Sequence, residues 1–368
     1  MQEDFRMADE DKILTGILTK ERLKPLLPFL ENDEITDIDW HGNSLWVNTI
    51  HNESVRIPDN EHSVTSEYID GFVSNIANSQ SKYFNKQNYK LEAESEELCL
   101  RITCLHESVA KTGTSVFIRK TTKETRFSYD SLIKSGYCSK DTLNLLINAV
   151  QGKLNIVICG EPEAGKTEFG KFLSMYIPDN EHTVTIEDTL EWHYKDLKPG
   201  ASHTSLQVNE VFTYTDALKE CMRINPKRIL LSEVRSVEAK NLIELWNTGS
   251  KGITTLHTDD VRKIPDRMLN MMPTRLDAER LRNNIYENLD IGILIRRKKV
   301  ANVIQRYIDQ IACFSRIDEE NLCRMILEDG GLVNKKLPAD KMSVLGKAGI
   351  DNPFIWQIRR ENEKQKEI

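Results

Sequence analysis

The chain has 368 residues, of which 39% are hydrophobic and 29% are charged, as in an ordinary globular protein long enough for two domains. A formal net charge of −7 provides no basic excess for general nucleic-acid binding, and we expect no direct contact with nucleic acid. The sequence has no apolar run of about 18 residues, an acidic start unlike a signal peptide, and seven scattered cysteines without a CxxC pair. We therefore expect a cytoplasmic protein with reduced thiols.

Residues 1–122 predict a small α+β domain. A helical pattern runs from Ile13 to Leu27 and is expected to stop at Pro28. Two alternating runs around a Gly-Asn turn predict a β-hairpin, and a helix and two strands follow it. These elements are expected at residues 35–40, 45–48, 64–80, 98–105 and 114–119. A charged, Thr-rich stretch then begins an expected linker over residues 123–138.

Residues 139–368 predict an α/β domain with a mostly parallel sheet, because apolar strand patterns alternate with amphipathic helical patterns. Helices are expected near 139–151, from 165, and over 214–224, 236–248 and 260–271. Strands are expected over 155–159, 183–187, 229–232 and 253–256. From about residue 316 we expect a helical appendage, with a helix over Leu345–Trp356.

The strongest motif runs from Gly160 to Thr167 and fits the pattern G-x-x-x-x-G-K-[ST]. It directly follows an apolar strand and opens a predicted helix, as a phosphate-binding loop does. The loop N–H groups would face phosphates, Lys166 would reach the β- and γ-phosphates of ATP, and the Thr167 hydroxyl would bind Mg²⁺. The predicted nucleotide-binding residues are Gly160, Glu161, Pro162, Glu163, Ala164, Gly165, Lys166, Thr167 and Glu168.

Acidic residues follow two of the other predicted strands. The apolar run 229–231 leads to Glu233, which is expected to orient or deprotonate the attacking water or to hold the water shell of the metal. The strand over 183–187 ends in Glu187 within a cluster of three carboxylates. These acids either bind metal and position water, or form the N-cap cluster of a helix.

A histidine, His257, follows the strand predicted over 253–256. One interpretation is a hydrogen-bonded structural side chain. The other is a residue at the nucleotide face that senses the γ-phosphate.

In this order and spacing, the four motifs resemble those of the secretion ATPase superfamily, which includes type II and type IV secretion ATPases and pilus motors. The resemblance is strongest to the hexameric ATPase of type IV secretion and conjugation systems, and it covers roughly residues 20–315. It implies a RecA-like P-loop domain preceded by a smaller α+β domain. The stretches that carry it are 34–38 and 116–120 at the front, 186–188, 218–235 and 252–257.

The resemblance also implies roles for individual residues. The implied catalytic residues are Glu233, Glu187, Lys166, His257, Arg235, Arg119 and Arg101. Arg101 and Arg119 would approach the nucleotide from the N-terminal domain, although a strand-edge ion pair is the alternative. Thr167 would bind Mg²⁺ directly, and Glu187 and Glu233 would do so through water. Glu163 stands where the family usually has Gly, and it either weakens ATP affinity or points away from the phosphates.

The function implied is a Mg²⁺-dependent ATPase that powers substrate transfer or pilus assembly in a type IV secretion or conjugative machine. The family resemblance further implies a homo-hexameric ring with the nucleotide between the two domains. Its partners would be other channel components at the inner face of the cytoplasmic membrane. The alternatives are a pilus assembly or retraction motor, and a nucleotide-binding scaffold with little turnover. A DNA translocase is disfavoured by the net charge of −7.

Overall fold

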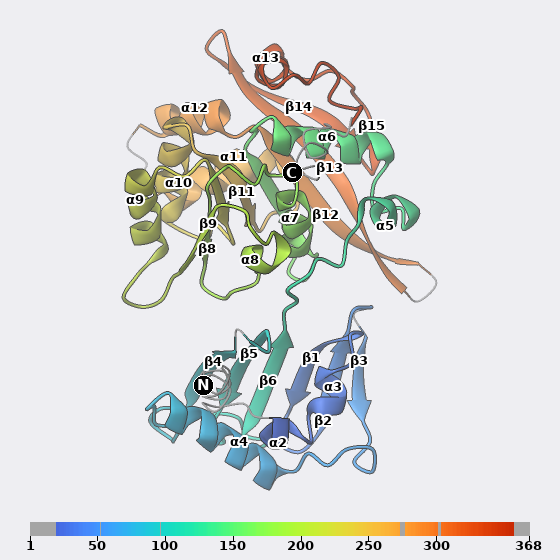
Figure 1. Cartoon of the computed structure of the whole chain (residues 1–368), viewed down its shortest axis with the longest axis vertical. Helices are drawn as coiled ribbons and strands as arrows, with labels where there is room; N and C mark the ends of the chain where they lie inside the picture. The colour runs from blue at the N-terminus through green and yellow to red at the C-terminus, as the bar shows by residue number, and fades with distance from the viewer. Residues whose placement is uncertain (1–19, 52, 96, 273–276, 301–302, 357–368) are drawn as a thin grey trace, which may run out of the picture. The chain divides into compact units, whose positions relative to one another are not determined.

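The computed structural model describes residues 20–51, 53–95, 97–272, 277–300 and 303–356. The chain divides into two compact units, Met1–Thr122 and Lys123–Ile368, and each is described by itself below (Figure 1). No helix in the described ranges combines the length and the hydropathy needed to span a bilayer.

The first unit is built on an antiparallel six-stranded sheet with the order β3-β2-β1-β6-β5-β4. Its strands are β1 (Ile35–Trp40), β2 (Leu45–Thr49), β3 (Ser54–Ile57), β4 (Lys90–Ser95), β5 (Leu100–Leu105) and β6 (Ser115–Lys120). Helix α4 (Ser66–Ser79) begins at the N-cap Thr65, whose side chain accepts a hydrogen bond from the backbone N–H of Tyr68. Its Ile69 and Ile76 are buried in one cluster with Ile38 of β1.

The predicted hairpin, the helix and the two later strands of this unit are confirmed, whereas β3 and β4 were not predicted. The expectation that a helix stops at Pro28 is wrong. Two short helices, α2 (Lys20–Leu23) and α3 (Leu27–Leu30), are present, and Pro28 lies in the first turn of α3. Proline is tolerated there because the first helical N–H groups have no partner within the helix. Residues 13–19 of the expected helix lie outside the described residues.

The second unit is built on a nine-stranded sheet with the order β15-β14-β13-β12-β7-β11-β10-β8-β9. Its strands are β7 (Ile156–Gly160), β8 (Thr183–Glu187), β9 (His203–Gln207), β10 (Arg228–Leu231), β11 (Lys251–Leu256), β12 (Ile291–Val300), β13 (Val303–Ile317), β14 (Glu320–Glu328) and β15 (Gly331–Leu332). The six strands from β12 to β9 in this order are parallel, and β13, β14 and β15 continue the sheet in antiparallel pairing. The mostly parallel α/β fold is therefore confirmed.

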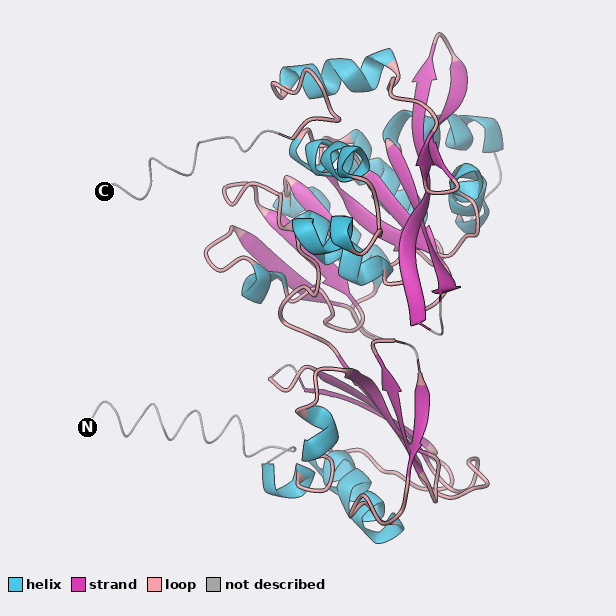
Figure 2. Cartoon of the chain, turned by 90° about the vertical axis from the view of Figure 1, so that its right-hand side faces the viewer, coloured by secondary structure: helices cyan, strands magenta, loops and turns pink. Residues whose placement is uncertain are grey.

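Helices cover both faces of this sheet (Figures 1 and 2). They are α5 (Tyr129–Lys134), α6 (Lys140–Gln151), α7 (Lys166–Ser174), α8 (Tyr194–Leu197), α9 (Tyr214–Ile224), α10 (Glu238–Asn247), η1 (Val261–Lys263), α11 (Ile264–Met271), α12 (Ala278–Asn288) and α13 (Ala339–Lys347). Ile156 and Ile158 of β7 lie in the core shared with α6 and α7, whereas Val157 and Cys159 lie in the core shared with α9, α10 and α11. This alternation is expected for a strand buried on both faces.

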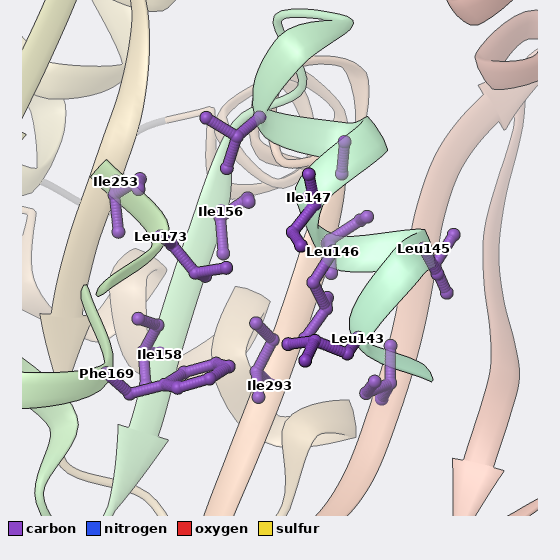
Figure 3. Packing of buried hydrophobic residues seen from close by; sticks show 14 of the residues in the cluster. Leu143, Leu145, Leu146, Ile147, Ile156, Ile158, Phe169, Leu173, Ile253 and Ile293 are labelled. Atoms are coloured by element: carbon purple, nitrogen blue, oxygen red, sulfur yellow. The ribbon is translucent and has the colours of Figure 1, made fainter. Parts of the chain in front are cut away.

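The core beneath α6 is drawn in Figure 3. Leu143, Leu146 and Ile147 of α6 lie in one fully buried cluster with Ile158 of β7 and Ile293 of β12. Every helix and strand predicted between residues 139 and 271 is present within a few residues of its expected bounds. The α/β alternation in this part of the sequence therefore predicted the central sheet correctly.

Three expectations about the rest of this unit are corrected. The stretch from residue 316 to 332 is not helical, because it forms the end of β13 and the strands β14 and β15. The C-terminal helix is α13, not 345–356, since the chain leaves the helix at Ala348 and turns at Gly349, which has a φ of +73°. Within the expected linker over 123–138, residues 129–134 form α5, and its Leu132 is buried in the core of the second unit.

The register of the parallel strands gathers the predicted motifs at one edge of the sheet. Leu256 of β11 pairs with Cys159 of β7, and Leu231 of β10 pairs with both Thr254 and Ile186. The loops that follow β7, β8, β10 and β11 therefore leave the sheet side by side. Ligands of open α/β sheets bind at this carboxyl edge.

Candidate functional site

The loop after β7 has the backbone shape of a phosphate-binding loop. Three of its residues have a positive φ: Gly160 at +151°, Glu163 at +61° and Gly165 at +86°. A Cβ on Gly160 would lie 2.6 Å from the carbonyl oxygen of Ile295 on β12, so only glycine fits there. Gly165 is the N-cap of α7, and the loop therefore ends at the N–H groups of a helix N-terminus, where anions bind.

Lys166 is the first residue of α7, and its side chain turns back onto this loop. Its ammonium donates hydrogen bonds to the carbonyl oxygens of Gly160 at 3.3 Å and Glu161 at 3.0 Å, and it lies 3.4 Å from Nδ1 of His257. Only 8% of the residue is exposed, and burial lowers the pKa of its ammonium although the charge of Glu233 opposes this. A cation held by neutral carbonyls at this place is suited to an anionic ligand.

The carboxylate of Glu233 lies between the side chains of His257 and Arg235. Its Oε1 is 3.2 Å from Nε2 of His257, and its Oε2 accepts a hydrogen bond of 2.9 Å from Nε of Arg235. The Arg235 guanidinium also donates to Oδ2 of Asp188 at 2.8 Å. Although burial acts in the opposite direction, the hydrogen bond to Glu233 and the charge of Asp188 raise the pKa of Arg235.

Three predicted residues thus meet in one chain of contacts, from Lys166 through His257 to Glu233. His257 also places its Nδ1 3.1 Å from the carbonyl oxygen of Gly160. These contacts fit both interpretations of this histidine, since it is hydrogen-bonded and also lies beside the loop. The catalytic roles of all three residues stay predictions.

The structure adds Tyr214, on α9, which the sequence analysis did not select. Its hydroxyl lies 2.8 Å from Oγ of Ser232 and accepts a hydrogen bond of 3.0 Å from the backbone N–H of Asp188. This tyrosine therefore joins the loops after β8 and β10 beneath Arg235. No local signal identifies it, because its position depends on how α9 packs against the sheet.

Glu187 is 1% exposed and caps the loop that follows it. One of its oxygens, Oε1, accepts hydrogen bonds from the backbone N–H groups of Glu191 at 3.0 Å and Trp192 at 2.9 Å. Burial raises the pKa of this carboxyl to about 8, against the effect of the two N–H donors. The alternative of a helix N-cap cluster is wrong, because the next helix, α8, has His193 as its N-cap and no side-chain cap. A role of Glu187 beside a metal stays a prediction.

Glu163 and Glu168 make contacts with other segments of the second unit. Glu168 accepts a hydrogen bond of 2.6 Å from the backbone N–H of Arg126. Glu163 is exposed, and its carboxylate faces Arg297 of β12 at 3.4 Å, while its carbonyl oxygen accepts from Arg306 of β13. Of the two outcomes weighed for Glu163, the structure shows the side chain turned toward these arginines, which the sequence analysis did not select.

Arg101 and Arg119 belong to the first unit. They lie directly opposite each other on β5 and β6, and Nε of Arg119 donates a hydrogen bond of 2.8 Å to Oδ1 of Asp37 on β1. Arg119 therefore makes the strand-edge ion pair that was the alternative for it. The approach of both arginines to a nucleotide stays a prediction.

The described residues contain no group of three or more His, Cys, Asp or Glu side chains arranged to hold a metal by themselves. Mg²⁺ usually takes one or two protein ligands, several waters and the phosphates of its nucleotide. Thr167 is half-buried at the start of α7, next to Lys166 in the sequence, and Glu233 is connected to Lys166 through His257. This oxygen set fits Mg²⁺ bound together with a nucleotide.

Comparisons with known proteins agree with this geometry. The family described as "Type II/IV secretion system protein" matches residues 75–332. An uncharacterised protein of Bacillus anthracis, pXO2-25, is 25% identical over 342 residues, which cover 88% of this chain and 75% of that protein. The type IV secretion system protein VirB11 of Bartonella quintana is 31% identical over 179 residues, which cover 45% of this chain and 49% of VirB11. The match thus spans about half of VirB11.

A solved structure shares the fold. It is the pilus retraction motor PilT with bound ADP, which has a TM-score of 0.61 and 16% identity and is matched over 88% of this chain and 86% of that one. At this identity the likeness concerns the fold alone. The family match, in contrast, covers more than half of the residues, and it includes the phosphate-binding loop, Glu233 and His257. The chain therefore belongs to the family of type II/IV secretion system proteins.

Proposed function

We propose that this chain is a Mg²⁺-dependent ATPase that acts as the ring-shaped motor of a type IV secretion or conjugative machine. The observation that carries the proposal is the line of contacts from Lys166 to His257 and from His257 to Glu233. It brings a phosphate-binding cation, an imidazole and a carboxylate to the carboxyl edge of the parallel sheet. A cation on the phosphates and a residue that positions the attacking water are groups that phosphoryl transfer to water uses.

Each side chain has a distinct task in this proposal. The loop N–H groups and Lys166 bind the β- and γ-phosphates of ATP, and Glu233 orients the attacking water and accepts its proton. Arg235 holds one carboxylate oxygen of Glu233, and His257 contacts the other. Thr167 would hold Mg²⁺ together with the phosphates, and the bound ion would neutralise charge on the leaving phosphate oxygens.

The assembly and the machine are part of the same proposal. A homo-hexameric ring would let Arg101 and Arg119 complete the nucleotide sites, since an arginine delivered by a second domain stabilises the transition state only when the site closes. The identity to VirB11 supports a type IV secretion machine, with channel components at the inner face of the cytoplasmic membrane as partners. A pilus motor is the alternative within the family. The likeness to PilT does not decide between them, because it concerns the fold alone.

The experiment is steady-state hydrolysis of Mg·ATP as a function of protein concentration. Lys166→Ala and Glu233→Gln are measured beside Glu244→Gln, a matched control on the exposed surface of α10. We expect activity per chain to rise as rings form, both site variants to lose at least about 100-fold in kcat, and the control to retain it. The proposal fails if the native chain hydrolyses ATP no faster than Glu233→Gln.

The second candidate is a nucleotide-binding scaffold with little turnover. The exposed carboxylates of Glu161 and Glu163 on the loop favour it, because they place negative charge near bound phosphates. Calorimetric titration with ATP measures binding separately from hydrolysis, and the two measurements together distinguish the scaffold from the motor. A chain that binds ATP and does not hydrolyse it, alone or with isolated membranes, is a scaffold.

A further inference from the structure

Two acidic side chains of the phosphate-binding loop meet one arginine of a neighbouring strand. Arg297 of β12 places Nη2 3.5 Å from Oε2 of Glu161 and Nη1 3.4 Å from Oε2 of Glu163. The side chains of the two glutamates are 72% and 61% exposed, whereas that of Arg297 is only 26% exposed. The arginine is thus the least exposed member of the group.

A second arginine holds the backbone of the same loop. Nε and Nη2 of Arg306, on β13, both lie 3.3 Å from the carbonyl oxygen of Glu163. A Cβ on Gly165 would lie 3.4 Å from Cδ of Arg306, so this side chain lies directly over the loop. Arg297 and Arg306 are partners in the antiparallel register of β12 and β13.

The strand register explains why these arginines reach the loop. Ile295 of β12 pairs in parallel with Gly160, the last residue of β7. Arg297 therefore follows two residues beyond the point where β7 gives way to the loop. The pair of strands continues past the end of β7 and carries both guanidinium groups alongside the loop.

Glu163 is the residue that makes such support necessary. It has a φ of +61°, a conformation that glycine adopts freely and that strains a residue with a Cβ. It also adds a second negative charge to a loop whose N–H groups favour anions. The bonds from Arg306 to its carbonyl and from Arg297 to its carboxylate oppose both effects.

We propose that Arg297 and Arg306 are positioning residues that clamp the phosphate-binding loop of this chain and neutralise its two glutamates. Arg306 holds the loop in its left-handed turn at Glu163. Arg297 offsets the charges of Glu161 and Glu163, so that the loop binds an anionic nucleotide in spite of them. The part of this inference that concerns nucleotide affinity rests on the proposed function.

The first test is a double-mutant cycle on the dissociation constant of Mg·ATP. Arg297→Gln is made in the native chain and in the Glu161→Gln/Glu163→Gly background, and Arg282→Gln, an exposed arginine paired with Asp266, is the matched control. We expect Arg297→Gln to weaken binding about 10-fold in the native chain and less than about 2-fold in the other background. An equal loss in both backgrounds overturns the proposal, because Arg297 would then contact the nucleotide itself.

The second test needs no nucleotide. Hydrogen exchange of the peptides that span residues 160–168 is compared for the native chain, Arg306→Gln and Arg306→Lys. We expect faster exchange for Arg306→Gln, partial recovery for Arg306→Lys, and no acceleration when Arg306→Gln is combined with Glu163→Gly. Unchanged exchange in Arg306→Gln overturns the clamp. If the native chain binds no ATP but its exchange follows this pattern, the proposed function fails and the clamp stands.

Discussion

The hydroxyl groups of Tyr214 and Ser232 lie 2.8 Å apart, and this contact ties helix α9 to the end of β10. The Tyr214 hydroxyl also accepts a hydrogen bond from the backbone N–H of Asp188. The carboxylate of Asp188 in turn accepts a hydrogen bond from Arg235. The position of Arg235 beside Glu233 therefore depends on a phenol from a helix that belongs to neither loop. This arrangement gives α9 a direct influence on the candidate catalytic carboxylate.

We expect Tyr214→Phe to lower kcat for ATP hydrolysis about 3- to 10-fold while KM changes less, because Asp188 and Arg235 lose their fixed position. The variant should cost about 1–3 kcal/mol of stability, since the backbone N–H of Asp188 loses its acceptor. Ser232→Ala and the Tyr214→Phe/Ser232→Ala double variant complete a double-mutant cycle on kcat. If the two effects simply add, the hydroxyl contact plays no part in catalysis.

Glu187 makes the stability of the second unit depend on pH. Burial raises its pKa to about 8 in the folded chain from the ordinary value of 4.5. A raised pKa means that the folded state keeps a proton that the unfolded state releases. Its contribution to stability is therefore complete below the unfolded pKa and is lost as pH rises toward 8.

Glu187→Gln keeps the acceptor for the N–H groups of Glu191 and Trp192 and removes the titration. From pH 6.5 to 8.5 we expect the native chain to lose about 2 kcal/mol relative to this variant. Urea denaturation at both pH values, in buffer with a chelator and without nucleotide, measures the difference. Parallel pH profiles for the two chains would show that Glu187 is ionised in the fold.

Gly170 of α7 lies against a buried indole ring. A Cβ at this position would lie 2.7 Å from Cη2 of Trp192, which is fully buried. We expect Gly170→Ala to destabilise the chain by about 1–3 kcal/mol, because the rigid ring must shift. Gly346→Ala on α13, where a Cβ has open space, is the matched control and should stabilise by up to about 1 kcal/mol. Thermal denaturation of both variants tests this, and equal behaviour would contradict it.

Helix α13 is fastened to the sheet by a buried ion pair. The ammonium of Lys341 lies 2.6 Å from Oδ1 of Asp290, and Oδ2 of Asp290 accepts the backbone N–H of Asn155 at 2.6 Å. Removing the cation alone leaves a buried carboxylate without its main partner. We expect Lys341→Met to cost about 3–5 kcal/mol in urea denaturation. Lys347→Met, at the exposed end of α13, should change stability by less than about 0.5 kcal/mol.

Local patterns in the sequence determined the phosphate-binding loop and the strand-end residues of the site. The strand before Gly160, the glycines of the loop and the helix that begins at Lys166 are dictated by short-range rules of burial and backbone conformation. For the same reason Glu233 and His257 could be recognised as strand-end residues. Their common location follows from the parallel sheet, in which all carboxyl ends meet at one edge.

The tertiary structure alone decided which side chains touch one another. Strand β12 ends in a charged run that has no apolar alternation beyond Ile295, and the short β9 and β15 carry equally weak signals. Without β12 and β13 in the sheet, nothing relates Arg297 and Arg306 to Glu163, more than 130 residues away in the sequence. The same holds for Tyr214 and Asp188, which meet only because α9 packs on β8 and β10. A sequence pattern records the environment of each segment, whereas contacts between segments depend on strand order and register, which only the folded chain supplies.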